Sequence, residues 1–165
     1  MKYDNWLNNV LENRELRQKK QWELIEKFNF PVLSLTINMP GDKKDSEDAK
    51  FIYEMALKEI DKLYFKEYAK ILTCKDTGYE ALFCLHVDAK KLKTFTCKIE
   101  DTHPLGRFMD MDVIDKSKNI LSRKSPRKCY ICDLKAKKCA RAQIHPLEEL
   151  QNFISKKVND YKLSL

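Results

Sequence analysis

The order of the secondary-structure patterns between residues 31 and 114 constrains the fold more than any other feature of the chain. Alternating or continuous apolar runs between turn residues predict strands, and apolar residues three and four apart predict amphipathic helices. The predicted elements, in chain order, are a strand at 31–38, a helix of about twenty residues capped by Asp45 or Ser46, strands at 70–76 and 79–88, a helix capped by Asp88, and a strand at 108–115. This order predicts an α+β fold with a ferredoxin-like split β-α-β core and an antiparallel or mixed sheet.

The segments on either side of this core add helices and one further strand. Residues 4–28 are predicted to form a helix, 120–123 a strand that pairs with 108–115 in a hairpin, and 146–162 a C-terminal helix. We expect one domain over residues 1–165, consisting of an N-terminal helix (1–30), an α+β core (31–123) and a basic, Cys-containing helical extension (124–165).

Charge and composition narrow the classes of function. The net charge is +7, and residues 116–141 hold ten Lys or Arg residues but one acid, Asp133, a balance that attracts polyanions. The three glycines, at 41, 78 and 106, all fall in predicted turns, which argues against P-loop and Rossmann nucleotide binding. No apolar run reaches the roughly 18 residues of a membrane span, and the N-terminus lacks a signal pattern. We therefore expect a cytoplasmic protein, in which six cysteines stay reduced.

Two carboxylates lie within an otherwise apolar predicted strand, in the sequence HPLGRFMDMDVID at 103–115. Side chains alternate across a strand, so Asp110 and Asp112 share one face while Met109, Met111 and Val113 face the core. Two carboxylates at this spacing can hold Mg²⁺, which prefers hard oxygen ligands and often adds substrate phosphates to its coordination. A merely solvated polar face is the alternative, and Arg107 together with the basic segment behind the pair favours the metal.

The N-terminal helix is apolar at both ends of one face and polar at its centre. Leu7, Val10, Leu11, Ile25 and Phe28 form the apolar stripe. Arg14, Gln18 and Gln21 occupy its middle, with Arg17 at the edge. A local gap filled by solvent would explain this, but the pattern also predicts a helix that lines a pocket and directs a guanidinium into it.

Three cysteines and a histidine near the C-terminus have a spacing that suits a metal. Cys129-x2-Cys132-x6-Cys139-x5-His145 supplies three thiolates and an imidazole, a set that can complete a tetrahedral structural Zn²⁺ site. The alternative is a group of reduced thiols in a small helical subdomain. A redox Cys-x-x-Cys is disfavoured because no thioredoxin-like βαβ pattern precedes it.

Seven segments together resemble one known family. They are LRQKKQ (16–21), VLSLTINMPG (32–41), GYEALFCLHVD (78–88), THPLGRFMDMDV (102–113), ILSR (120–123), RKCYIC (127–132) and CARAQIHPLEEL (139–150). In order and spacing, and over most of the chain, they resemble the holo-citrate lyase synthases, that is, the apo-citrate lyase phosphoribosyl-dephospho-CoA transferases. The resemblance implies an enzyme that transfers the prosthetic group of triphosphoribosyl-dephospho-CoA to a serine of the acyl carrier subunit of citrate lyase and releases pyrophosphate.

Within that reaction we expect an in-line displacement at the α-phosphorus. Asp110 and Asp112 would hold Mg²⁺, and Arg107 would act beside them on the phosphates. The substrate-binding residues that we expect are Arg14, Arg17, Gln21, Lys44, Arg123, Arg127, Lys128 and Arg141.

Two other classes of function compete with the enzyme. A basic nucleic-acid-binding module with a zinc knuckle would explain the charge and the cysteines, but not two acids that would repel phosphates. We therefore regard nucleic acid as an unfavoured partner. A docking scaffold without chemistry is the second competitor, and pyrophosphate release distinguishes it from an enzyme.

Overall fold

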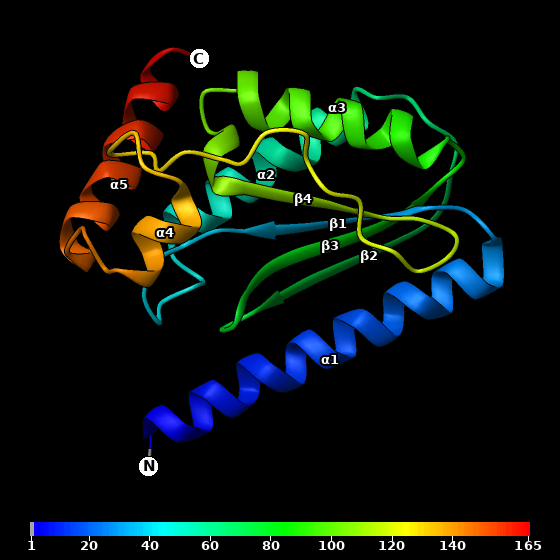
Figure 1. Cartoon of the computed structure of the whole chain (residues 1–165), viewed down its shortest axis with the longest axis horizontal. Helices are drawn as coiled ribbons and strands as arrows, with labels where there is room; N and C mark the ends of the chain where they lie inside the picture. Colours follow the sequence, from blue (N-terminus) through cyan, green and yellow to red (C-terminus); the bar gives the residue numbers. More distant parts are fainter. Residues whose placement is uncertain (1) are drawn as a thin grey trace.

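Four strands form one open antiparallel sheet at the centre of the molecule (Figure 1). The computed structural model describes residues 2–165, with side chains described from residue 5 onward. The strands β1 (Val32–Ile37), β2 (Glu67–Lys75), β3 (Gly78–Leu85) and β4 (Met109–Ile114) are arranged in the order β2-β3-β1-β4. With helices α2 (Glu47–Asp61) and α3 (Ala89–Thr102) the chain order is β-α-β-β-α-β, which confirms the predicted α+β fold.

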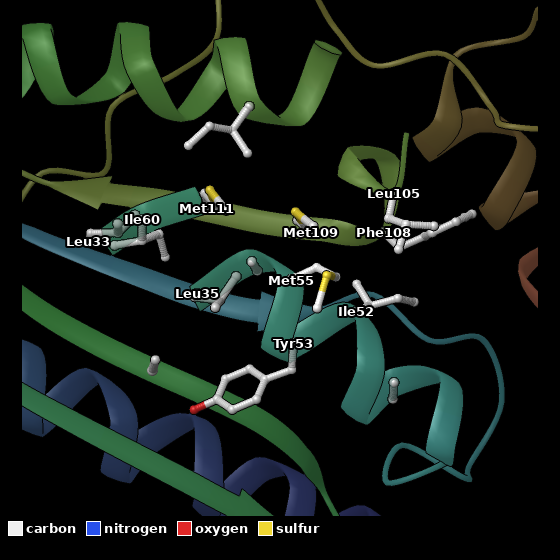
Figure 2. Close-up of a cluster of buried hydrophobic side chains, with 14 of the residues drawn as sticks. Leu33, Leu35, Ile52, Tyr53, Met55, Ile60, Leu105, Phe108, Met109 and Met111 are labelled. Carbon is white, nitrogen blue, oxygen red and sulfur yellow. The ribbon is translucent and has the colours of Figure 1, made fainter. Parts of the chain in front are cut away.

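One face of the sheet carries the main hydrophobic core, under α2, α3 and α5 (Leu147–Leu163). The predicted caps start both central helices: the Ser46 hydroxyl accepts a hydrogen bond from Ala49 N at 3.2 Å, and the Asp88 carboxylate accepts one from Lys91 N at 2.9 Å. Figure 2 shows the centre of this core, where β1 and β4 meet α2 through Leu33, Leu35, Ile52, Met55, Met109 and Met111.

Helix α1 (Lys2–Phe28) lies on the opposite face of the sheet (Figure 1). Its C-terminal half buries Leu24 and Ile25 in a second apolar cluster with residues of β1, β3 and β4. The N-terminal half of the predicted apolar stripe does not pack in this way, since Leu7 and Leu11 are 46% and 47% exposed.

Two predicted elements differ from the structure. Residues 120–123 do not form a strand: Ile120 makes one isolated bridge with Ile114, and Leu121 N donates a hydrogen bond to Val113 O at 2.9 Å. Beyond that point Arg123 is drawn toward α3 by ion pairs with Glu100 and Asp101. Helix α2 has 15 residues rather than about twenty, because the chain turns at Lys62 before β2.

A 3-10 turn, η1 (Gly106–Phe108), immediately precedes β4 in the core.

The C-terminal extension has an irregular first part and a helical second part. The short helix α4 (Ala136–Arg141) precedes α5. After β4 an irregular segment runs back to the end of the sheet at which α4 and α5 lie (Figure 1). Among the described residues, no helix combines the length and the apolar character that crossing a membrane requires.

Candidate active site and metal centre

Asp110 and Asp112 of β4 lie on the sheet face that α1 covers. Their neighbours Met109, Met111 and Val113 are fully buried in the main core, which confirms the alternation expected from the sequence. In the antiparallel pairing with β1, Asp110 lies opposite Thr36 and Asp112 opposite Ser34. Opposed residues in such a ladder share a face. Two carboxylates and two hydroxyls therefore form a small oxygen-rich patch.

The polar centre of α1 faces this patch across a groove of about 280 Å³, which we call the acidic groove. It is lined by Arg14, Glu15, Arg17, Gln18, Gln21, Ser34, Thr36, Asp110, Asp112 and Ile120. The structure thus brings three of the predicted substrate-binding residues, all on α1, to the predicted metal-binding pair. Gln21 is fixed there by a hydrogen bond from its Nε2 to Ser34 Oγ at 3.0 Å.

The acidic pair is only partly neutralised by the protein. Asp112 makes no hydrogen bond or ion pair with the described residues, and Asp110 approaches one cation, Arg127, whose Nη2 lies 3.7 Å from Asp110 Oδ1. Burial, followed by the neighbouring charge of Asp110, raises the pKa of Asp112 above its ordinary value. Two adjacent carboxylates in this state favour a bound cation, and their oxygen ligands suit a hard divalent ion.

Arg17 lies at the groove but is held by a carboxylate that sequence analysis missed. Glu80 on β3 accepts hydrogen bonds from Arg17 and from Asn13 Nδ2, the latter at 2.8 Å. Burial raises the pKa of Glu80, and the charge of Arg17 works against that rise. A single acid within the apolar sequence YEALFCL was the available signal for such a buried partner.

A second missed carboxylate, Glu100 on α3, organises two predicted arginines. Its side chain is 1% exposed, forms ion pairs with Arg123 and Arg127, and accepts a hydrogen bond from Met111 N at 2.8 Å. A buried carboxylate requires such partners. The sequence signal was helical spacing, since Glu100 follows the buried Lys93 by seven residues on the inward face of α3.

Arg107 and Lys44 lie outside the acidic groove, in a neighbouring cavity of about 750 Å³ that we call the cationic cavity. Arg127 lines it as well. Arg107 belongs to η1, which packs tightly on α3: a Cβ on Gly106 would lie 2.5 Å from the carbonyl oxygen of Ile99. Arg107 therefore lines the cationic cavity, whereas Asp110 and Asp112 line the adjoining acidic groove, and its predicted role on the phosphates stays a prediction.

Lys128 and Arg141 are not brought to either site. The side chain of Lys128 is 72% exposed, and its Nζ lies 3.7 Å from Asp133 Oδ1. Arg141 lies with Lys135, Lys137 and Lys138 on α4, and we call these four residues the α4 surface. Their substrate-binding roles remain predictions, and their positions suit a large partner better than a small ligand.

The three cysteines and the histidine singled out by spacing form a compact cluster that can hold a metal. One potential ligand atom from each of Cys129, Cys132, Cys139 and His145 lies within 4.8 Å of the others. The Nδ1 atom of His145 lies 3.3 Å from Glu149 Oε2, while its Nε2 atom is buried and has no hydrogen-bond partner among the described residues. A metal-binding histidine commonly has a carboxylate on its other ring nitrogen.

Local backbone structure prepares Cys129 for ionisation. The segment forms a tight turn in which Cys129 N donates to Leu134 O at 2.7 Å and Ile131 N approaches Cys129 Sγ at 3.5 Å. Burial alone would raise the pKa of the Cys129 thiol, but the backbone N–H groups of Cys132 and Ile131 and the neighbouring thiols lower it to about 7. Thiolate is the form that binds metal.

Comparisons with known proteins identify the family of the chain. The family model for apo-citrate lyase phosphoribosyl-dephospho-CoA transferase matches residues 5–161. A probable apo-citrate lyase phosphoribosyl-dephospho-CoA transferase of Vibrio cholerae serotype O1 (strain M66-2) is 34% identical over 164 residues, covering 94% of this chain and 92% of the relative. The Escherichia coli O1:K1 / APEC apo-citrate lyase phosphoribosyl-dephospho-CoA transferase is 32% identical over 161 residues, covering 92% and 87%. The chain therefore belongs to the apo-citrate lyase phosphoribosyl-dephospho-CoA transferase family.

Proposed function

We propose that the chain transfers the phosphoribosyl-dephospho-CoA group of triphosphoribosyl-dephospho-CoA to a serine of the acyl carrier subunit of citrate lyase. The observation that carries this proposal, beside the family assignment, is the acidic groove. Two carboxylates short of counter-charge face Arg14 and two glutamines there, in a chain whose net charge is +7. Such a site suits a cation-bound polyphosphate.

The reaction is an exchange of one P–O bond for another. The serine Oγ attacks the α-phosphorus, and the bond from the α-phosphorus to the bridging oxygen breaks. The hydroxyl proton goes to a base, and pyrophosphate leaves with the electron pair of the broken bond. Arg14 and the amide of Gln18 can hold phosphate oxygens in line, because both side chains line the groove opposite the carboxylates.

Asp110 and Asp112 would hold Mg²⁺ in this proposal. The bound ion would supply charge neutralisation on the phosphates and a lower pKa for the attacking hydroxyl. The fit is supported by the raised pKa of Asp112, which burial and Asp110 produce, and by the hydroxyls of Ser34 and Thr36 beside the pair. Hard oxygen donors of this kind are what Mg²⁺ takes.

The Cys/His cluster would hold a structural Zn²⁺. Three thiols and an imidazole leave no open ligand position in a tetrahedral site, which favours a structural over a catalytic ion. The buried, unpartnered Nε2 of His145 and the lowered pKa of Cys129 support this assignment. The zinc would fasten the turn at 129–132 to α4 and to the start of α5.

The α4 surface is the proposed docking site for the acyl carrier subunit. Its four cations are Lys135, Lys137, Lys138 and Arg141, and acyl carrier proteins are typically acidic. Ala136, Cys139 and Ala140 of the same helix line the cationic cavity, so a carrier bound there would lie beside it. The family assignment does not favour the competing nucleic-acid-binding module.

Pyrophosphate release tests the proposal against both competitors. With Mg²⁺, pyrophosphate should appear only when triphosphoribosyl-dephospho-CoA and the apo carrier subunit are both present. Random single-stranded DNA in place of the carrier should give none. Absence of pyrophosphate in the complete mixture would contradict the proposal and favour a docking scaffold.

A further inference from the structure

The cationic cavity is lined by three half-buried cations, of which only one forms an ion pair with a described carboxylate. Lys44, Arg107 and Arg127 line it, and none of the described lining residues is an Asp or Glu. Arg127 is paired with Glu100 and approaches Asp110, so its charge is already used. Arg107 forms no ion pair with a described residue, and Lys44 Nζ donates to a neutral group, the carbonyl of Met39.

The surroundings of Arg107 and Lys44 disfavour the charged form of each side chain. Burial, then the charges of Arg127 and Arg123, lowers the pKa of Arg107. Burial, then the charge of Arg14, lowers the pKa of Lys44. Burying a charge is costly unless a counter-charge accompanies it. Asp42 and Asp101 offset only part of this effect, so an anion from outside the chain would supply further counter-charge.

Much of the rest of the cavity wall is apolar, although Asn38, Gln143 and three residues of the Cys/His cluster (Cys129, Cys139 and His145) also line it. Met39 and Pro40 come from the loop after β1, Leu147 and Leu150 come from α5, and Tyr130 comes from the metal-binding turn. A volume of about 750 Å³ is that of a site for a nucleotide-sized ligand. Cations and apolar groups in one cavity suit an anion that carries an extended organic arm.

The cavity adjoins the acidic groove. Arg127 lines the cavity and at the same time approaches Asp110 in the groove, with 3.7 Å between Nη2 and Oδ1. A ligand with two phosphate groups can therefore occupy both sites. In the groove, phosphate would bind through a metal ion held by the carboxylates. In the cavity, phosphate would bind directly to the cations.

We propose that the cationic cavity binds the non-reacting diphosphate and organic arm of the donor, through Arg107 and Lys44 and without a divalent ion. The identity of the donor rests on the proposed function, but the anion site does not. The triphosphate then lies at Asp110 and Asp112, so that one donor molecule contacts both sites.

Dephospho-CoA tests this assignment because it carries the diphosphate and the arm but lacks the triphosphate. Its affinity is measured by calorimetry in Mg²⁺-free buffer without chelator, on the wild type and on Arg107→Gln, Lys44→Gln and Lys43→Gln. Lys43 is the matched control, since it neighbours Lys44 in sequence but is exposed and does not line the cavity. Arg107→Gln and Lys44→Gln should each weaken binding about tenfold or more, the loss expected for one charge-assisted hydrogen bond. Lys43→Gln should change it less than about twofold.

Inorganic pyrophosphate and pantetheine separate the two parts of the site. Pyrophosphate should compete with dephospho-CoA but bind more weakly, and pantetheine should bind more weakly still. The assignment is overturned if both cavity variants keep wild-type affinity, or if binding requires Mg²⁺ and is lost in Asp110→Asn. Pyrophosphate that binds as tightly as dephospho-CoA would overturn the role of the apolar wall. Thermal melting shows whether each variant is folded. Lys44 and Arg107 lie on different segments, so if one variant is unstable, the other still tests the assignment.

The outcome is independent of the transfer assay. If dephospho-CoA binds through Arg107 and Lys44 but no carrier is modified, the anion site stands and the proposed function fails. If the carrier is modified while the cavity variants bind dephospho-CoA normally, the proposed function stands and the anion site fails.

Discussion

The guanidinium of Arg127 joins buried Glu100 to the acidic pair: it forms an ion pair with Glu100, and its Nη2 lies 3.7 Å from Asp110 Oδ1. It also forms the border between the acidic groove and the cationic cavity. One arginine thus serves two protein carboxylates, and Asp112 makes no ion pair with a described residue. This shortage of positive charge in the groove, beside a surplus in the cavity, is the electrostatic basis of the proposed function.

Asp112→Asn should abolish transfer and stabilise the metal-free protein. A folded-state pKa above the unfolded value contributes stability that is present below the unfolded pKa and is lost as pH rises through the folded pKa. At pH 7 the ionised Asp112 therefore costs stability, and the neutral amide removes that cost. We expect a rise in Tm of a few degrees, at about 2–4 °C per kcal/mol for a chain of this length, and activity at least about 100-fold lower.

The pH dependence of the Tm difference between Asp112→Asn and the wild type is the control for that variant. Below the ordinary aspartate pKa of 3.8 the wild-type carboxyl is protonated in both states, so the difference in Tm should vanish. A variant with a lower Tm at pH 7 would contradict the account of Asp112, and near-normal turnover with saturating Mg²⁺ would contradict its role as a metal ligand. Asp110→Asn should lose activity to a similar degree.

Arg14→Ala should raise the KM for the donor about tenfold with little change in Tm, because Arg14 is exposed at the groove and contributes little to folding. Lys19→Ala is the matched control on the same helix, as Lys19 is exposed and does not line the groove. Steady-state kinetics and melting curves measure both. A large fall in Tm with unchanged KM would show that Arg14 is structural.

Purified protein should carry about one zinc per chain by elemental analysis. Cys139→Ser should lose the metal and lower Tm, because metal binding energy contributes to folding. Cys74→Ser, which changes an exposed cysteine on β2 away from the cluster, should keep the metal and the wild-type Tm. Metal-free wild-type protein that melts cooperatively at the Tm of the metal-loaded form would leave these residues as ordinary thiols.

Glu100→Gln should destabilise the fold by about 3–5 kcal/mol, because it removes the buried carboxylate that pairs with two half-buried guanidinium groups. Asp101→Asn is the matched control: Asp101 also binds Arg123, but its side chain is 54% exposed, so the loss should stay below about 1 kcal/mol. Urea unfolding measures both. Equal losses in the two variants would contradict the central role of Glu100.

Replacing Lys135, Lys137 and Lys138 together with Glu should raise the KM for the carrier and flatten its dependence on salt. The KM for the donor should stay nearly unchanged, because none of the three residues lines the groove or the cavity. The same reversal of the exposed Lys90, Lys91 and Lys98 on α3 changes net charge equally and controls for it. Equal effects on donor and carrier would show that the α4 surface binds phosphates.

Sequence patterns predicted those features that depend on local periodicity. Alternation placed Asp110 and Asp112 on one face, and the polar break in α1 indicated that Arg14 and Gln21 line a pocket. Sequence patterns did not predict the structure where partners distant in sequence determine the path of the chain. Residues 120–123 resemble a strand, yet Arg123 turns away to reach Glu100 on α3. Arg107 is three residues from Asp110 in sequence, but it lines the cationic cavity and not the acidic groove, which the spacing did not indicate.

The mass of the carrier subunit tests the central claim most directly. Apo acyl carrier subunit of citrate lyase is incubated with the enzyme, triphosphoribosyl-dephospho-CoA and Mg²⁺, and its intact mass is then measured. The account predicts a gain equal to one phosphoribosyl-dephospho-CoA group with wild-type enzyme, and no gain with Asp110→Asn or with a carrier whose acceptor serine is replaced by alanine. An unchanged carrier mass with wild-type enzyme, or the same gain with Asp110→Asn, would contradict it.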